Sequence, residues 1–269
     1  MISRLAQAVL FICAATTVGA QSPNPTPNLQ LPVLCELGTD CFIQQYVDHD
    51  TSRQAMDFQC SSLSYDGHKG TDFALVTYEQ MHAGVNVVAA ATGQVQGVRD
   101  GLADVVYTED NASNVAGREC GNGVVIQHAD GWSTQYCHLK RGTVSVKSGD
   151  TVQAGDVLGQ IGLSGRTQFP HLHVTLRHNG KVIDPFAPEG VRVCGGPPQA
   201  GLWKTPIAYE PGGVIAMGFS DSVPSFDAIK QGTAAKGDLN SSTPALVVFA
   251  YLFGTKAGDV LDMQLAGPN

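Results

Sequence analysis

Between residues 61 and 190, short apolar runs alternate with turn signals at intervals of roughly ten residues, a spacing typical of short strands. The last two runs are separated by Asn179-Gly180, a dipeptide that favours a tight hairpin turn. No helical periodicity of useful length interrupts the series. The pattern therefore predicts an all-β domain over residues 61–190, with strands at residues 72–76, 85–90, 93–98, 123–128, 132–136, 171–177 and 182–183.

Residues 191–269 differ in composition from the predicted domain, and the change comes after Pro197-Pro198. Residues 214–219 and 245–253 are apolar runs that suit strands of a second, smaller β-rich region. This region is shorter than a β-sandwich usually requires, so we expect it to be incomplete.

The other segments are more polar. Residues 100–120 are rich in Asp, Asn and Gly and are predicted to form a long loop. Residues 21–60 read as an N-terminal linker, rich in Pro and Asn up to residue 34, followed by an extension held by disulfides.

The composition supports a β-rich soluble domain and excludes one class of partner. The chain has 31 Gly and 14 Pro in 269 residues, which favours strands and turns over helical bundles. Its net charge is -8, and it carries no basic patch, so nothing indicates nucleic-acid binding. The acidity is compatible with a cationic or a neutral substrate.

Residues 1–20 have the pattern of an export signal. Arg4 provides the positive charge, residues 5–18 the apolar run, and Val18-Gly19-Ala20 a site for cleavage before Gln21. An apolar run of about 14 residues is too short to cross a bilayer core of roughly 30 Å as a helix. We expect a cleaved signal, an exported protein in the periplasm or outside the cell, and no transmembrane segment afterwards.

Cleavage would remove one cysteine and leave six, an even number that favours disulfides in an exported chain. Six cysteines allow fifteen pairings, which sequence alone does not resolve. Cys35 and Cys41 flank a turn that contains glycine, and Cys120 and Cys137 lie in segments expected to be hairpin partners. The remaining pair is Cys60 with Cys194. A zinc-cysteine site is disfavoured because the chain has no Cys-x-x-Cys motif.

Histidine and aspartate residues at two places in the predicted domain suggest a metal site. His171 and His173 are two apart in a predicted strand, so both face the same side about 6.6 Å apart. His68 and Asp72 would lie roughly 13 Å apart in a straight strand, which is too far for two ligands of one zinc ion. A bend is required between them, and Gly67 and Gly70 permit one.

Several motifs resemble, in order, those of the lysostaphin/LytM-type zinc endopeptidases, which form peptidase family M23. They are residues 67–73 (GHKGTDF), 88–95, 123–131, 136–139 (YCHL), 152–162, 170–173 (PHLH) and 184–185. The resemblance covers about residues 60–188. It implies an antiparallel, sheet-based LytM-type catalytic domain of the duplicated-hybrid-motif kind, followed by the smaller β-rich region.

The resemblance also implies the roles of five residues. His68, Asp72 and His173 match the family's ligands to a single Zn²⁺ ion, and His138 and His171 match its two catalytic histidines. The chain has no His-Glu-x-x-His motif, so no glutamate is positioned as a general base. His171 is the better candidate to take a proton from a zinc-activated water, and His138 to bind the oxyanion and protonate the leaving amine. These two roles could be exchanged.

The substrate implied by the resemblance is the peptide cross-bridge of bacterial peptidoglycan, cleaved by a monomer. One alternative is a non-catalytic LytM-like regulator or wall-binding module, although all the ligand positions are filled here. Another is a carrier domain, because residues 148–156 resemble a biotinyl or lipoyl hairpin. Such a domain needs a modifiable lysine at the hairpin tip, and none lies between Lys147 and Lys181.

Overall fold

The structure is a computed structural model of the chain, and it describes residues 26–191, 194 and 200–267. The predicted export signal lies outside these residues. Among the helices of the described part, none is long and apolar enough to span a membrane.

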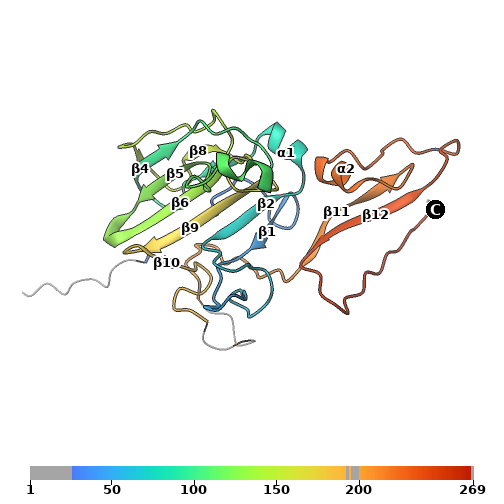
Figure 1. Cartoon of the computed structure of the whole chain (residues 1–269). Coiled ribbons are helices and arrows are strands. Elements are labelled where there is room, and N and C mark those ends of the chain that lie inside the picture. The colour runs from blue at the N-terminus through green and yellow to red at the C-terminus, as the bar shows by residue number, and fades with distance from the viewer. Residues whose placement is uncertain (1–25, 192–193, 195–199, 268–269) are drawn as a thin grey trace, which may run out of the picture.

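A single eight-stranded sheet dominates the fold (Figure 1). Its order is β1-β2-β9-β6-β5-β4-β7, β10 pairs with β9, and all these pairs are antiparallel. The all-β, antiparallel class predicted from the sequence is therefore confirmed. The strands are β1 Cys41–Gln45, β2 Thr71–Leu75, β4 Gly93–Arg99, β5 Asn122–Gln127, β6 Trp132–Leu139, β7 Thr151–Val152, β9 His171–His178 and β10 Lys181–Ile183.

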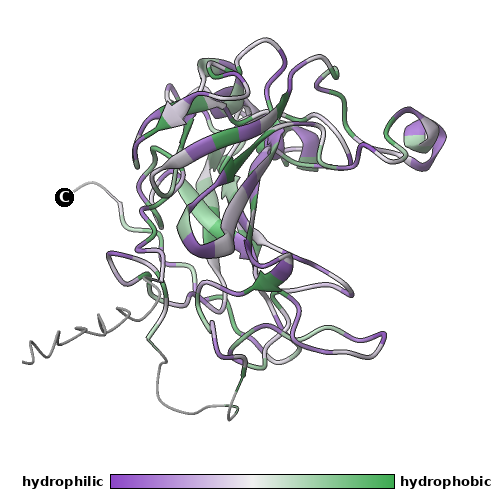
Figure 2. Ribbon diagram, turned by 90° about the vertical axis from the view of Figure 1, so that its left-hand side faces the viewer, coloured by the Kyte–Doolittle hydropathy of each residue, from purple (hydrophilic) through white to green (hydrophobic). Residues whose placement is uncertain are grey.

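The two faces of the central strands have different characters. In β9, Leu172, Val174 and Leu176 are buried in the hydrophobic core, whereas His171 and His173 are half-buried on the other face. Successive residues of a strand point to opposite faces, so the alternation in sequence assigns one face to the core and one to the polar site. Figure 2 shows hydrophobic and hydrophilic residues alternating along the strands.

The core lies between this sheet and a small sheet made of β3 (Asn86–Val88) and β8 (Val157–Gln160). Val87 and Leu158 of the small sheet belong to the same buried cluster as Leu172 and Val174. A buried hydrogen bond from the Ala90 amide to the Tyr136 hydroxyl joins the two layers.

Three features of the domain were not anticipated. β7 and β8 are short strands on either side of the turn at residues 153–156. A helix, α1 (Tyr78–Ala83), follows β2, and Thr77 caps it by accepting a hydrogen bond from the Gln80 amide. Its six residues are too few to show a helical period. Two 3-10 helices, η1 (Glu109–Asn114) and η2 (Ala129–Gly131), interrupt the loops.

The N-terminal segment contributes to the sheet and its core. β1 lies inside the predicted extension, yet it pairs with β2, so the sheet begins before residue 61. Leu29 and Val33, in the segment read as a linker, are both 2% exposed in the core. These apolar residues are widely spaced among prolines, so they do not show the two-residue period of a strand. Their burial is evident only from the tertiary contacts.

All three disulfides expected from the sequence are present: Cys35–Cys41, Cys60–Cys194 and Cys120–Cys137. Cys60–Cys194 spans 134 residues and ties the segment before β2 to the segment after β10. Closing so long a loop restricts the unfolded chain more than a short loop does.

The C-terminal region is a hairpin of β11 (Gly213–Ser220) and β12 (Val247–Phe253), and the connection between the strands includes α2 (Phe226–Gln231). It projects from the side of the main sheet near β1 and α1 (Figure 1). Phe253 packs on Phe42 of β1 with ring centroids 4.7 Å apart. Lys256 Nζ also donates a hydrogen bond to Ser61 Oγ.

Candidate metal centre and its histidines

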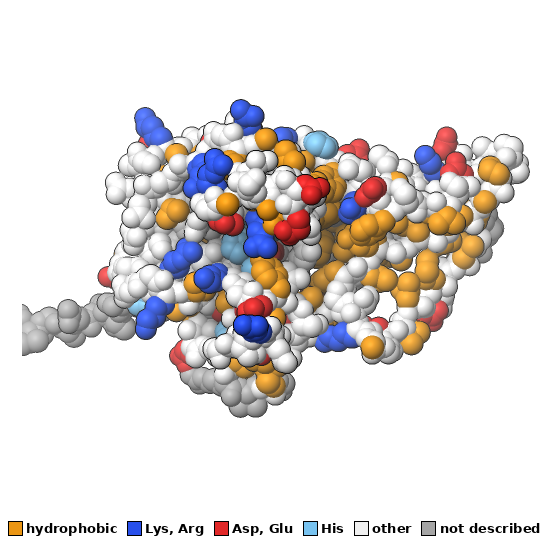
Figure 3. Space-filling view, viewed as in Figure 1, with side chains coloured by type: hydrophobic (Ala, Val, Ile, Leu, Met, Phe, Trp, Pro, Cys, Tyr) orange, Lys and Arg blue, Asp and Glu red, His pale blue; other side chains and the backbone are white. Residues whose placement is uncertain are grey.

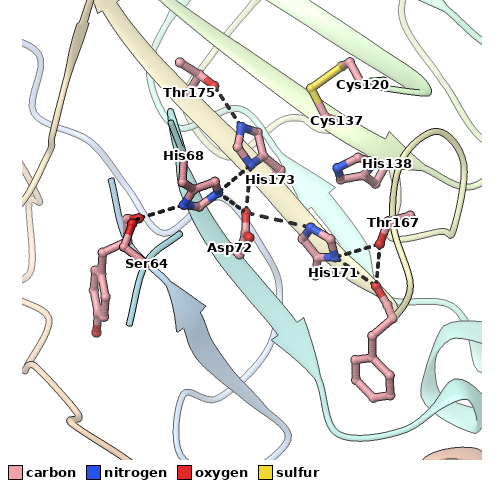
Figure 4. Close-up of polar contacts among 12 residues, drawn as sticks. Ser64, His68, Asp72, Cys120, Cys137, His138, Thr167, His171, His173 and Thr175 are labelled. Carbon is pink, nitrogen blue, oxygen red and sulfur yellow. Dashed lines mark hydrogen bonds and ion pairs between the residues drawn. A yellow bond between two sulfur atoms is a disulfide. The ribbon is translucent and has the colours of Figure 1, made fainter. Parts of the chain in front are cut away.

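Asp72 and His173 lie opposite each other on neighbouring strands, β2 and β9. Directly paired residues of an antiparallel ladder have their side chains on the same face. Asp72 Oδ1 is 2.7 Å from His173 Nδ1. His171 lies on the same face, two residues along β9, as the strand period requires (Figure 4).

His68 reaches this pair from the loop before β2. Gly67, with φ of +74°, makes a turn just before His68, and the chain bends at Gly70 before β2 begins, so the predicted bend is present. Gly70 allows close packing, because a Cβ at this position would lie 2.6 Å from His173 Nε2. His68 Nδ1 donates to the Tyr46 carbonyl at 2.7 Å, which leaves Nε2 facing Asp72 Oδ1 at 3.2 Å.

These three side chains form a possible metal site. His68 Nε2, Asp72 Oδ1 and His173 Nδ1 lie within 4.8 Å of one another. Two imidazole nitrogens and one carboxylate oxygen are donors that zinc prefers, and three protein ligands leave a fourth position open. Thr175 Oγ1, 3.0 Å away, accepts the Nε2 proton of His173 and so leaves the Nδ1 lone pair to the centre. The residues present therefore fit a zinc ion.

His171 and His138 complete the group without belonging to the donor set. His171 Nδ1 donates to the Phe169 carbonyl at 2.8 Å, and its Nε2 lies 3.8 Å from Asp72 Oδ1. His138 Nδ1 donates to the Ser164 carbonyl at 2.8 Å. Each of these two imidazoles thus donates a hydrogen bond from Nδ1 to a backbone carbonyl, and its Nε2 does not take part in that hydrogen bond.

Burial and mutual charge set the ionisation of the group. Burial works to raise the pKa of Asp72, but His68, His171 and His173 around it outweigh burial and hold that pKa well below its usual range. Burial, reinforced by His171 and His173, holds the pKa of His138 well below its usual value. Against the effect of burial, the charge of Asp72 raises the pKa of His68.

All five residues selected from the sequence therefore lie in one group. Rings of His138 and His171 are 4.7 Å apart, and those of His138 and His173 are 6.0 Å apart. In the space-filling view, histidine side chains appear within a hollow of the main domain (Figure 3).

The sequence reasoning missed residues that contact these histidines. Thr175 follows His173 by two, so the strand period alone could have placed it beside the imidazole. Tyr65 lies against His68, with ring centroids 4.4 Å apart, and is 54% exposed. Thr167 Oγ1 is 3.1 Å from His171 Nδ1. Tyr65 and Thr167 are in loops, where no period indicates their partners.

The predicted loop at residues 100–120 packs beside this group. The amide of Tyr107 donates to the Thr167 carbonyl at 2.8 Å, and that of Val105 donates to the Leu163 carbonyl at 3.2 Å. The loop therefore supports the segment of residues 163–169, which provides the carbonyls that bind His138 and His171.

Comparisons with known proteins identify a family for the central part of the chain. Residues 66–185 match the sequence model of peptidase family M23. Cell division protein DipM of Caulobacter vibrioides is 32% identical over 126 residues, which are 47% of this chain and 18% of DipM. Peptidoglycan DD-endopeptidase ShyA of Vibrio cholerae is 33% identical over 117 residues, 44% of this chain and 22% of ShyA. The chain thus spans about a fifth of the length of these curated relatives.

Among solved structures, the chain is similar to the catalytic domain of a mutant of EnpA, a prophage-encoded M23 protein from Enterococcus faecalis. The TM-score is 0.38 at 24% identity, and the match covers 56% of this chain and 92% of that chain.

Proposed function

Through residues 66–185 the chain belongs to peptidase family M23, and on this premise we propose that it is a zinc metalloendopeptidase. Its proposed substrate is the peptide cross-bridge of bacterial peptidoglycan. The observation that carries the proposal is the convergence of His68, Asp72 and His173 within 4.8 Å, with two further imidazoles beside them.

Contacts within the fold orient the three proposed ligands. Asp72 and His173 are opposed on a sheet ladder, and the Tyr46 carbonyl orients the ring of His68. A zinc ion bound by them would supply a Lewis acid that makes water nucleophilic near neutral pH. The protein's own contribution would be to present the three ligand atoms and to leave a fourth coordination position open.

We assign uptake of the water's proton to His171. Its Nδ1 is a donor to the Phe169 carbonyl, so the neutral ring carries a lone pair on Nε2, which faces the group. Asp72 Oδ1 is 3.8 Å from that nitrogen and stabilises the positive charge that follows proton uptake.

We assign His138 to the leaving amine. Because its Nδ1 already donates to the Ser164 carbonyl, the ring can donate from Nε2 only after it has gained a second proton. Burial disfavours that charge, so the gained proton is readily passed on. The ring lies 4.7 Å from His171, close enough for both to serve one scissile bond.

The proposed substrate and location rest on separate observations. ShyA, 33% identical to part of this chain, is named a peptidoglycan DD-endopeptidase. Three disulfides favour an oxidising compartment, as does the export signal expected at residues 1–20. We propose that the protein acts in the periplasm or outside the cell, where peptidoglycan lies.

Digestion of purified peptidoglycan by the zinc-loaded protein tests the proposal. We expect release of peptide fragments, identified by mass, and loss of that release when a chelator removes the metal. His171→Ala is the matched control, because it should keep zinc and lose turnover. Release of sugar fragments would reject the peptidase function, and zinc binding without any release would favour the non-catalytic alternative.

A further inference from the structure

An irregularity in the ladder between β5 and β6 coincides with His138. Asn122 pairs with Leu139 and Val124 pairs with Tyr136, so one residue of β5 faces two residues of β6, Cys137 and His138. This is the arrangement of a β-bulge, in which one strand carries an extra residue. His138 itself has φ of +64°, in the left-handed region that residues other than glycine rarely adopt.

The bulge decides the face on which His138 lies. Tyr136 is fully buried, and Cys137 pairs with His173 on the face of the metal centre. Strict alternation would return His138 to the core face beside Tyr136. With the extra residue, both Cys137 and His138 lie on the side of His173 (Figure 4), and Leu139 returns to the core.

Both backbone groups of His138 are bound by neighbouring loops. Its amide donates to the Cys120 carbonyl at 2.8 Å, and its carbonyl accepts from the Gly162 amide at 2.9 Å. Cys120 is also joined covalently to Cys137, the residue that precedes His138. The disulfide therefore links Cys120, whose carbonyl accepts the hydrogen bond from the His138 amide, covalently to the bulge at residues 137–138.

The two loops that contact His138 are packed against each other at glycines. A Cβ at Gly121 would lie 2.2 Å from the Ser164 carbonyl oxygen, and one at Gly165 would lie 2.3 Å from that of Glu119. Such approach of backbone to backbone is open only to glycine. Ser164, in the second loop, is the acceptor for His138 Nδ1.

We propose that the Cys120–Cys137 disulfide is a positioning element that holds the β-bulge at residues 137–138 and thereby keeps His138 facing the metal centre. An unusual backbone conformation persists only where its surroundings over-determine it, and such residues gather at functional sites. The disulfide and the hydrogen bond to Cys120 provide that constraint here. Of the effects expected on removing the disulfide, only the loss of turnover rests on the proposed function.

The test compares removal of this disulfide with removal of a remote one. In Cys120→Ser/Cys137→Ser we expect hydrogen exchange at the His138 amide to accelerate by about tenfold or more. Zinc content should be retained, since the proposed ligands are on β2, on β9 and in the loop before β2. kcat should fall by about 10²-fold, as expected when a reacting group is displaced by about an ångström.

Cys35→Ser/Cys41→Ser is the matched control, because that disulfide lies in the N-terminal segment and Cys41 pairs with Leu75, not with one of the five site residues. It should leave both the exchange at His138 and kcat close to the parent values. Should Cys120→Ser/Cys137→Ser not fold, Cys120→Ala/Cys137→Val fills the buried volume with apolar side chains and is expected to give the same result.

A double-mutant cycle with His138→Ala separates positioning from general stability. If the disulfide acts through His138, its removal in the His138→Ala background should lower kcat no further. Additive losses, or unchanged exchange at residue 138, would overturn the inference. Hydrogen exchange and zinc content can be measured without turnover. If the parent protein fails to cleave peptidoglycan, the proposed function is rejected. The positioning role of the disulfide is then still decided by hydrogen exchange at residue 138.

Discussion

The main sheet and the β11–β12 hairpin are both antiparallel, but only the main sheet separates an apolar face from a polar one. In β9 the buried Leu172 and Val174 alternate with His171 and His173. In the hairpin, Met217 is 68% exposed and Phe219 is 41% exposed, and apolar side chains cover much of the visible surface (Figure 3).

The difference follows from the number of strands. Eight strands with a second sheet behind them bury one face of the central strands, which leaves the other face of those strands free for charged and polar groups. A hairpin of two strands cannot bury a face by itself. The site chemistry is therefore confined to the part of the chain that has a core behind it, and we expect substitutions in the two regions to act on different measurements.

The largest expected effect comes from the ligands on the main sheet. Asp72→Ala removes the only carboxylate of the proposed donor set. Loss of a residue that only orients a metal ligand typically lowers metal affinity by up to roughly 100-fold. Loss of Asp72 itself should lower zinc affinity by more than that. Metal analysis of the purified variant measures this. Met217→Ser, on the hairpin, should retain zinc, and an Asp72→Ala protein with full zinc would contradict the assignment.

The histidine beside the ligands should separate binding from turnover. His171→Ala is expected to keep zinc but to lower kcat by about 10²–10⁴-fold, the usual scale for a proton-transfer group. The measurement pairs metal content with the rate of peptide release. An isolated variant without zinc would mean that His171, rather than His173, binds the metal.

A smaller effect is expected where a side chain acts on a ligand. Thr175→Val removes the hydroxyl that accepts the His173 Nε2 proton and should weaken zinc binding by about 10–100-fold. Competition with a chelator gives the dissociation constant. Thr175→Ser keeps the hydroxyl and should restore affinity, whereas equal losses in both variants would indicate that packing, not the hydrogen bond, matters.

Substitution in the hairpin should act on stability alone. Phe253→Ala removes the aromatic pair with Phe42, worth about 0.5–1.5 kcal/mol beyond the area it buries. Denaturant unfolding would show this loss, while zinc affinity and kcat remain those of the parent. A parallel loss of zinc would show that the hairpin and the metal centre are coupled.

The smallest effect concerns pH and His128, a buried residue in the turn between β5 and β6. Burial lowers the pKa of His128, although its hydrogen bond to the Thr92 carbonyl opposes this. Below pH of about 6.5 the unfolded chain therefore binds a proton at this residue more readily than the folded chain, and the free energy of unfolding falls. His128→Gln should flatten this dependence when unfolding is measured between about pH 5 and 7.

The exposed His82 provides the control for that measurement. His82→Gln removes an exposed imidazole and is measured over the same pH range. An equal flattening in both variants would show that the effect belongs to the chain's overall charge and not to the buried imidazole.

Much of the fold could be predicted because local patterns and strand periodicity carry it. The positions of β5, β6 and β9 follow from apolar runs, and Asn179-Gly180 indicates the turn before β10. β1 could not be placed with them, because its pairing with β2 joins segments separated by a long polar stretch. Pairing partners that far apart leave no local signal.

The sequence by itself determined the candidate chemistry: which histidines and aspartate occur in the motifs of the family, and that His171 and His173 share a face. Only the tertiary structure decided how they meet. Asp72 lies opposite His173 because of the register of β2 and β9, and His138 faces them because a bulge reverses its side. Register and bulges depend on how two strands pair, which the period of one strand does not specify, and one residue of slip exchanges the two faces of a strand.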